Sequence, residues 1–245
     1  MIPKIIHYCW FGKGPFPKKV QECIASWHKF LPDYEIKEWN EENFDISQSC
    51  PFVREAYEKG KYAFVSDYVR LYALLEEGGI YMDVDVEVLR PFDLSIFVQP
   101  LNFSLEEGGL IAGEFMAAEP GQKFLETMLE VYHRMRFIRE DGSLNMAVNN
   151  TYLQEELAKL GYEKRPQRQL LSASNIELWP CDYFQCRSLV TGKVTLTENS
   201  YCIHWHTILW SSWQTKLFNF LRIKVLVPLM GSQNYGKLQK LFGRV

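Results

Sequence analysis

Short apolar runs alternate with helical apolar patterns in the first part of the chain. The run KIIHYC, residues 4–9, is typical of a short strand, and the Gly and Pro residues of WFGKGPFP end it. From Lys18 to Leu31 apolar side chains recur at helical spacing, which predicts an amphipathic helix that stops near Pro32. The run YEIKEW, residues 34–39, predicts a second strand.

A second strand–helix unit follows this one. Residues 62–77, YAFVSDYVRLYALLEE, show a helical pattern, and the two glycines at 78 and 79 are typical of a helix C-terminus. Residues 78–89, GGIYMDVDVEVL, are predicted to form the next strand. Alternating strands and helices of this kind indicate an α/β fold whose first half is a parallel, nucleotide-binding arrangement.

Beyond Pro91 the pattern is less regular. We expect a strand in GLIAGEFMAA, residues 109–118, helices over 121–137 and 150–160, and a hairpin or strand pair in VTLTENSYCIHWH, residues 194–206. No internal repeat or low-complexity linker divides the chain. We therefore predict one domain over residues 1–231, followed by a basic and apolar tail over residues 232–245.

The predicted strand over 78–89 carries Asp83, Asp85 and Glu87 on alternate positions. Side chains two apart in a strand share one face, so these like charges would repel one another. A divalent cation would neutralise them, and Mg²⁺ and Mn²⁺ prefer oxygen ligands. The alternative is a solvated edge strand whose acids face water, because an isolated D-x-D is common.

Composition narrows the class of protein. The chain has 245 residues, 47% of them hydrophobic, and a formal net charge of −3, so it can build a large core and does not suit a general nucleic-acid binder. Six cysteines lack a C-x-x-C pair, and the N-terminus lacks the pattern of a signal peptide. These features predict reduced thiols and a cytoplasmic location.

Asp67 and Arg70 lie three residues apart on the predicted helix, hence on one face. Such a pair is usually a surface ion pair worth a few tenths of a kcal/mol. Here it stands just before the acidic strand, within SDYVRLYALLEEGGIYMDVDVEVLRPFD, residues 66–93. The closeness of this pair to the acidic strand in the sequence favours one site that Asp67 and Arg70 share with Asp83 and Asp85.

This stretch resembles glycosyltransferase family 32, whose sugar transferases carry a DXD motif and include yeast initiating mannosyltransferases and bacterial capsular-polysaccharide transferases. The glucosyltransferase domains of large clostridial toxins are a more distant likeness. IPKIIHYCWFG resembles the family's opening strand, SWHKFLPDYEIKEWNEENFD the segment after it, and YCIHWHTILWSSW its C-terminal His and Ser-Trp segment. The resemblance thus covers most of the chain.

The resemblance implies a GT-A type, Rossmann-like fold that binds a nucleotide sugar. It also implies a metal-dependent, retaining transfer of a sugar from a nucleotide-diphosphate donor to a glycan or lipid-linked glycan, in polysaccharide or capsule synthesis. Mn²⁺ (or Mg²⁺) would be the cofactor. A metal-dependent phosphohydrolase and a non-catalytic glycan-binding protein stay open as alternatives.

The resemblance also assigns roles to particular residues. Asp83, Asp85 and Arg70 would be catalytic, with Asp85 as the direct metal ligand, and Glu87 would be an ordinary surface acid. His204 or His206 would add a metal ligand, and His204 fits the family pattern better. The expected donor contacts are Trp10, Ser66, Asp67, Arg70, Tyr81, Asp83, Ser212 and Trp213.

Several of these assignments have open alternatives. Trp10 would stack on the donor's base or belong to the core, and Tyr81 would line the donor pocket or only pack. The spacing between His204 and the Ser212–Trp213 pair is longer than in the family, which leaves the roles of that pair open.

The last part of the chain has a separate signal. After Glu198 there is no Asp or Glu, and basic residues mix with bulky apolar ones in KLFNFLRIKVLVPLM and KLQKLFGRV. This composition suits an anionic membrane surface, which here would be the inner face of the cell membrane. A C-terminal helix packed on the domain is the alternative.

Overall fold

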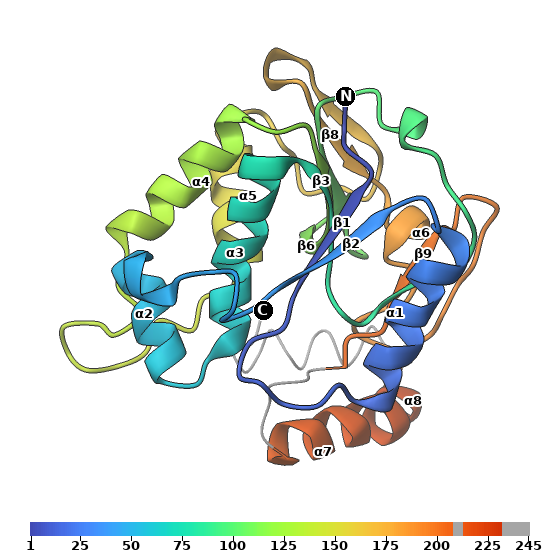
Figure 1. Ribbon diagram of the computed structural model, residues 1–245. Coiled ribbons are helices and arrows are strands. Elements are labelled where there is room, and N and C mark those ends of the chain that lie inside the picture. Colours follow the sequence, from blue (N-terminus) through green and yellow to red (C-terminus); the bar gives the residue numbers. More distant parts are fainter. Residues whose placement is uncertain (208–212, 232–245) are drawn as a thin grey trace.

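In the computed structural model, which describes residues 1–207 and 213–231, a seven-stranded sheet lies between two groups of helices (Figure 1). The strand order is β2-β1-β3-β6-β5-β8-β7, and a separate two-stranded sheet pairs β4 with β9. The sequence predicted an α/β fold, and this layered arrangement confirms that class.

The predicted parallel half is present. β1 (Ile5–Cys9) pairs in parallel with β2 (Glu35–Trp39) on one side and with β3 (Gly79–Met82) on the other. The crossovers contain α1 (Lys18–Phe30) and α3 (Tyr62–Glu77). β1, β2, α1 and α3 begin and end within a few residues of their predictions, whereas β3 ends earlier than predicted. A glycine at 78 with a positive φ of 66° ends α3.

The other half of the sheet is mixed. β6 (Ile111–Ala118) runs antiparallel to β3 and to β5 (Leu101–Leu105), whereas β5 runs parallel to β8 (Ile176–Trp179). β7 (Gln169–Leu171) closes the edge antiparallel to β8. Only β6 was predicted among these strands, because β5, β7 and β8 are short and lack a clear alternation.

Helices cover both faces of the sheet (Figure 1). α4 (Lys123–Arg134) and α5 (Asn149–Ala158) confirm the two later helix predictions, while α2 (Pro51–Glu58) and the single turn α6 (Cys181–Phe184) were not predicted. Three 3₁₀ turns complete the loops, at Ile46–Gln48, Leu94–Ile96 and Ser172–Ser174.

Alternate side chains of β3 enter two different cores. Tyr81 packs in the cluster beneath α2, α3 and α4, whereas Ile80 and Met82 pack in the cluster beneath α1. All three side chains are buried. The strand is therefore covered on both faces, as expected for a central strand that begins as a continuous apolar run.

The acidic segment is not one strand, so the prediction of three acids on one face of a strand is wrong. β3 ends at Met82, residues 83–85 form a turn, and β4 (Val86–Val88) pairs antiparallel with β9 (Cys202–His204). α1 holds β4 away from the main sheet: Trp27 Nε1 donates to Val86 O at 2.7 Å, and Val88 N donates to Ser26 Oγ at 2.9 Å.

The hairpin expected over residues 194–206 is also wrong. β9 pairs with β4 instead of with its own neighbours in sequence, and Val194 makes one isolated bridge with Arg187. The apolar alternation in this segment reflects a strand whose partner lies over 100 residues away in the sequence.

A final helical segment follows β9. It consists of α7 (Trp213–Leu221), a π-helical turn at Arg222–Leu226 and α8 (Val227–Met230). Ser212 and the tail over 232–245 lie outside the described residues, so the boundary at 231 stays a prediction. Within the described ranges no helix combines the length and apolarity that crossing a bilayer requires.

Candidate functional site

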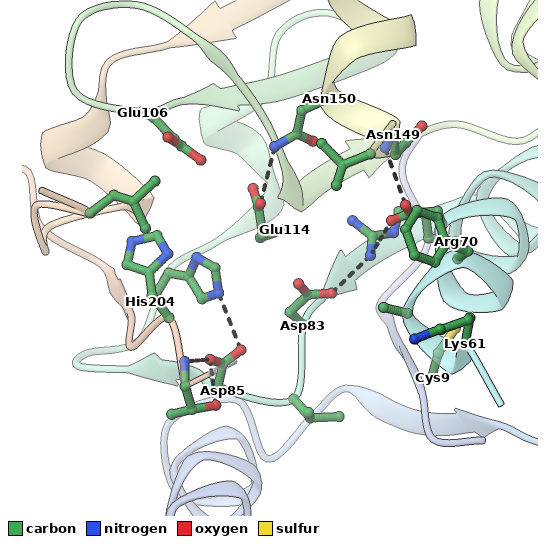
Figure 2. A pocket seen from close by; sticks show the side chains of 18 of the residues that line it. Cys9, Lys61, Arg70, Asp83, Asp85, Glu106, Glu114, Asn149, Asn150 and His204 are labelled. Carbon is green, nitrogen blue, oxygen red and sulfur yellow. Dashed lines mark hydrogen bonds and ion pairs between the residues drawn. The ribbon is translucent and has the colours of Figure 1, made fainter. Parts of the chain in front are cut away.

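A cavity of about 690 Å³ opens where β3 ends (Figure 2). The turn after β3 contributes Asp83 and Asp85, α3 contributes Asp67 and Arg70, and β6 contributes Glu114. The cavity lies outside the carboxyl ends of parallel strands β1 and β3, the usual place for ligands in open α/β sheets.

Asp85 links the turn after β3 to the segment after β9. Its Oδ1 lies 3.2 Å from His204 Nε2, and its Oδ2 accepts hydrogen bonds from Thr207 N at 2.7 Å and Thr207 Oγ1 at 2.8 Å. Trp205 N donates to the backbone carbonyl of Asp85 at 3.0 Å. Both side chains of the Asp85–His204 pair are buried.

The pKa values of this pair follow from mutual attraction that outweighs burial. Burial by itself would favour the neutral acid, but His204 and the hydrogen bonds from Thr207 hold the pKa of Asp85 well below its usual range. Burial would likewise favour a neutral imidazole, but the Asp85 carboxylate raises the pKa of His204 to about 9. Without a bound cation the pair is therefore charged at neutral pH, and His204 must release this proton when its imidazole binds a metal ion.

Asp83, Asp85 and His204 together can hold a metal ion. Each offers one ligand atom, and these atoms lie within 4.8 Å of one another. His204 Nδ1 is also buried and has no hydrogen-bond partner among the residues that the structure describes. Two carboxylates and an imidazole fit Mn²⁺ well, and fit it better than Mg²⁺, which prefers oxygen ligands throughout.

His206 has different surroundings. Its ring centroid lies 4.0 Å from that of His204, and its Nε2 lies 3.3 Å from the carbonyl oxygen of Arg187. Burial and the neighbouring His204 lower the pKa of His206 to about 3. His206 lines the cavity but is outside the three-ligand group, which favours His204 as the ligand.

Asp67 and Arg70 are not a surface ion pair. Their side chains are 11% and 7% exposed, and Arg70 Nη2 lies 3.0 Å from Asp67 Oδ1 and 3.3 Å from Asp83 Oδ1 (Figure 2). Arg70 also donates from Nη1 to Gly113 O at 3.0 Å and from Nε to Ser66 O at 3.3 Å. The neighbouring carboxylates raise its pKa well above the usual value against the effect of burial, so it stays charged.

Tyr81 completes the support of Asp83. Its hydroxyl donates to Asp83 Oδ1 at 2.8 Å, and its ring lies 4.8 Å from the Arg70 guanidinium carbon. Burial raises the pKa of Asp83 to about 6, although Arg70 opposes this effect. Tyr81 is itself buried, so it holds Asp83 from behind instead of facing the cavity.

Two further expected donor contacts, besides Tyr81, lie away from the cavity wall. Trp10 is buried in the core, with its Nε1 donating to Gly14 O at 2.7 Å and its ring centroid 4.8 Å from that of Phe16. Ser66 is buried in α3, and its hydroxyl donates to Tyr62 O at 3.1 Å. Neither lines the cavity. Ser212 and the side chain of Trp213 lie outside the described residues.

Glu87 is not the ordinary surface acid that was expected. Its Oε2 accepts hydrogen bonds from Lys19 Nζ and from Trp205 Nε1, both at 2.8 Å, and Lys19 lies 3.8 Å above the Trp205 ring. The contact joins α1, β4 and the segment after β9. It therefore helps to hold His204 beside Asp85.

Polar residues that the sequence did not single out line the wall formed by β6 and the start of α5, called the α5–β6 wall below (Figure 2). It adjoins the Asp67–Arg70 pair, because Asn149 N donates to Asp67 Oδ2 at 3.1 Å. Asn149 Nδ2 and Glu114 Oε2 are buried without hydrogen-bond partners among the described residues, while Asn150 Nδ2 donates to Glu114 Oε1 at 3.1 Å. A methyl group at Gly113 would lie 3.0 Å from Asn150 Oδ1 and 3.1 Å from Asn149 Nδ2. The absence of a side chain at Gly113 thus lets both amides approach β6. In the sequence, Glu114 within the otherwise apolar strand IAGEFMAA was the one feature that could have indicated this wall.

Glu106 adds a further acid to this wall. Burial, together with the nearby charge of Glu114, raises the pKa of Glu106 to about 8. The raised pKa values of Glu106 and Asp83 have a common cause, since both carboxylates face a desolvated cavity rich in acids. A bound cation would relieve this crowding.

The chain is similar to known proteins over part of its length. Residues 17–102 match the family described as "Glycosyltransferase sugar-binding region containing DXD motif". Inositol phosphoceramide mannosyltransferase 3 of Schizosaccharomyces pombe is 35% identical over 95 residues, 38% of this chain and 26% of that protein. Subversion of eukaryotic traffic protein A of Legionella pneumophila is 23% identical over 170 residues, 57% of this chain and 26% of that protein. The chain thus spans about a quarter of each.

Solved structures with a similar arrangement include two glycosyltransferases. The PaToxG glycosyltransferase superposes with a TM-score of 0.46 and 20% identity, over 65% of this chain and 70% of that one. A glycosyltransferase involved in glycosylation of the major capsid of PBCV-1 gives a TM-score of 0.49 and 10% identity, over 87% of this chain and 97% of that one.

The first prediction concerns the metal ligands. Asp85→Asn and His204→Ala should each weaken Mn²⁺ binding more than about ten-fold, because each removes one ligand atom. His206→Ala is the matched control, since it deletes an adjacent cavity imidazole outside the three-ligand group, and it should retain affinity. Isothermal titration with Mn²⁺ measures the three dissociation constants. A larger loss in His206→Ala would reverse the assignment of the ligand.

The second prediction concerns Arg70. Arg70→Lys should lower the free energy of unfolding by about 1–3 kcal/mol, because the shorter fork-less side chain leaves buried acceptors unpaired. Arg168→Lys is the control, since Arg168 also contacts a buried acid, Glu177, but is 46% exposed. Urea denaturation monitored by fluorescence compares the two. Equal stabilities for both variants would show that Arg70 does not hold the site together.

Proposed function

We propose that this protein transfers a hexose from a nucleotide-diphosphate sugar to a hydroxyl group of a glycan or lipid-linked glycan. The match of residues 17–102 to the glycosyltransferase sugar-binding region containing a DXD motif supports this proposal. One observation supports the proposal most strongly. The possible metal ligands Asp83, Asp85 and His204 lie in the same cavity as the buried Asp67–Arg70 pair. The S. pombe relative is a mannosyltransferase, which supports hexose transfer.

Departure of the nucleoside diphosphate is the step that needs help, because negative charge develops on its leaving oxygen. Asp85, His204 and Asp83 would hold the divalent cation, which when bound supplies Lewis-acid stabilisation of that charge. Thr207 and Glu87 keep these groups in place through their contacts with Asp85 and Trp205. We infer a GT-A type fold, since the parallel β2–β1–β3 group ends at this cavity.

We assign Arg70 a positioning role. Its guanidinium donates to Ser66 O and Gly113 O and pairs with Asp67 and Asp83, which leaves little of its donor capacity for a phosphate. Asp83 is held by Arg70 and Tyr81 while its side chain keeps 25% exposure, so it can still accept hydrogen bonds from the donor sugar. Arg70 thus acts through Asp83.

The buried polar atoms of the α5–β6 wall that lack partners among the described residues would recognise the donor sugar. A buried donor or acceptor without a partner costs about 1–3 kcal/mol, so a ligand that pairs with it gains that amount. Asn149 Nδ2 would donate to one sugar hydroxyl and Glu114 Oε2 would accept from another. Sugars that differ in one hydroxyl orientation would then differ in affinity.

The resemblance of residues 66–93 to capsular and initiating transferases supports a retaining reaction in polysaccharide synthesis. In that reaction the acceptor hydroxyl would enter from the face that the diphosphate leaves. We assign no covalent nucleophile, because Asp83 and Asp85 are already paired with Arg70 and with His204.

The third prediction tests the function itself. Incubation with Mn²⁺, a panel of UDP- and GDP-hexoses and a mixed oligosaccharide acceptor should yield a glycosylated acceptor and the free nucleoside diphosphate. Asp83→Asn should lower turnover at least 100-fold, and Glu126→Gln on the outer face of α4 should not change it. Release of inorganic phosphate without transfer would indicate a phosphohydrolase. Binding of glycan without either product would indicate a non-catalytic glycan-binding protein.

The fourth prediction tests the sugar-recognition wall. Asn149→Ala and Glu114→Gln should change the ratio of kcat/KM between hexose donors about ten-fold, because each removes one hydrogen bond to a hydroxyl. Asn43→Ala, in the loop after β2, is the control and should leave the ratio unchanged. If both site variants lower kcat/KM equally for every donor, the wall does not select the sugar.

A further inference from the structure

The helical segment α7–α8 exposes a continuous apolar face. Leu217, Phe220, Leu221, Val225 and Leu229 are 48%, 58%, 42%, 41% and 79% exposed. Leu217, Phe220 and Leu221 lie at positions i, i+3 and i+4 of α7, which places them along one side of that helix. Val225 in the π-helical turn and Leu229 in α8 are exposed apolar side chains that follow them. These five residues are called the apolar face below.

A different side of the segment contacts the domain. Arg222 Nη2 donates to Leu189 O at 2.9 Å, and Val227 is buried. A methyl group at Gly192 would lie 2.8 Å from Ile223 Cγ2, so the chain at 192 packs tightly on the helix. The apolar face is therefore distinct from the face that holds the segment to the body.

The exposed side of α7–α8 is apolar, which is the opposite of an ordinary surface helix. A surface helix places polar residues toward water, whereas a helix that is apolar on its outer side covers that side with a partner or a membrane. Five large apolar side chains in about three turns form an exposed patch of the kind that marks an interaction site.

Charge indicates the kind of partner. Lys224 is exposed among the residues of the apolar face, and no Asp or Glu occurs anywhere after Glu198. The chain as a whole has a net charge of −3, so its acids are concentrated before this segment. A basic helix with Phe and Leu on its outer side suits an anionic lipid surface, where such helices bury their apolar face about 5–10 Å deep.

The segment also lies beside the site. Leu189 lines the cavity, and its carbonyl oxygen accepts the hydrogen bond from Arg222. Figure 1 shows α7 and α8 on the outside of the α/β body, below α1. A surface that holds this segment would lie close to the cavity rim.

We propose that the apolar face of α7–α8 docks the protein on an anionic lipid surface, with Lys224 contributing to the attraction. The face then inserts Phe220 and Leu229 among the lipids while Arg222 and Ile223 keep their contacts with the domain. The cavity rim at Leu189 is brought near the membrane. This docking does not depend on the transfer reaction.

The test uses the full chain and two vesicle types, phosphatidylcholine alone and phosphatidylcholine with one third phosphatidylglycerol. At low salt the protein should sediment with the anionic vesicles at least ten-fold more than with the neutral ones. Phe220→Glu combined with Leu229→Glu should abolish this sedimentation. Val98→Glu combined with Leu170→Glu is the matched control, since these two apolar side chains are 76% and 51% exposed elsewhere.

Further measurements distinguish loss of membrane docking from loss of folding and from dimerisation. Mn²⁺ affinity should be unchanged in Phe220→Glu with Leu229→Glu, which separates loss of docking from loss of folding or of the metal site. Lys224→Glu alone should weaken binding to the anionic vesicles about five-fold. A full-length protein that ignores anionic vesicles overturns the proposal. So does a dimer, detected by light scattering, that only Phe220→Glu with Leu229→Glu dissociates, because a second copy then covers the face. Equal loss of vesicle binding in both double variants overturns it as well.

Discussion

The hydrogen-bonded ion pair between Asp85 and His204 is the contact on which the site depends. It joins the turn after β3 to the end of β9, which are far apart in sequence, and the bonds from Thr207 to the same carboxylate strengthen it. A buried ion pair loses its hydration, and only good geometry and additional hydrogen bonds offset that cost. Glu87 and Trp205 supply one such contact nearby, and the β4–β9 pairing supplies the backbone frame.

The two walls of the cavity differ in a way that suits binding. On one wall Asp67, Arg70, Tyr81 and Asp83 satisfy one another, so their positions are set before any ligand arrives. On the adjoining α5–β6 wall Asn149 and Glu114 keep buried polar atoms without partners among the described residues. Side chains that are already hydrogen-bonded fix the orientation of a bound ligand. Buried polar atoms without partners instead favour the binding of a ligand whose hydroxyl groups can pair with them.

The helical segment α7–α8, which follows β9, lies at the surface and has two different sides. Arg222 anchors it to a residue of the cavity rim, and its outer side carries the apolar face. The anchor and the apolar face use different sides of one helix. A partner at the outer side would therefore be placed near the cavity without occupying it.

Local patterns were sufficient for the elements that have strong periodicity or clear end signals. The helices over Lys18–Phe30 and Tyr62–Glu77 and the strands over Ile5–Cys9 and Glu35–Trp39 lie where the apolar spacing and the glycine and proline residues put them. The spacing of Asp67, Arg70, Asp83 and Asp85 also indicated a shared site, because a helix and the strand after it meet at one edge of a parallel sheet.

Tertiary structure decided the rest. The acidic run reads as one strand, but α1 and β9 bind the backbone of residues 86–88, so the chain leaves the sheet at Met82 and the carboxylates sit in a turn. The choice between His204 and His206 depends on that same pairing, since a strand's register determines which imidazole meets Asp85. The wall at Asn149 and Glu114 depends on the contact of α5 with β6 at Gly113, which joins residues more than thirty positions apart. Sequence periodicity reports local geometry, and contacts between distant segments leave no such pattern.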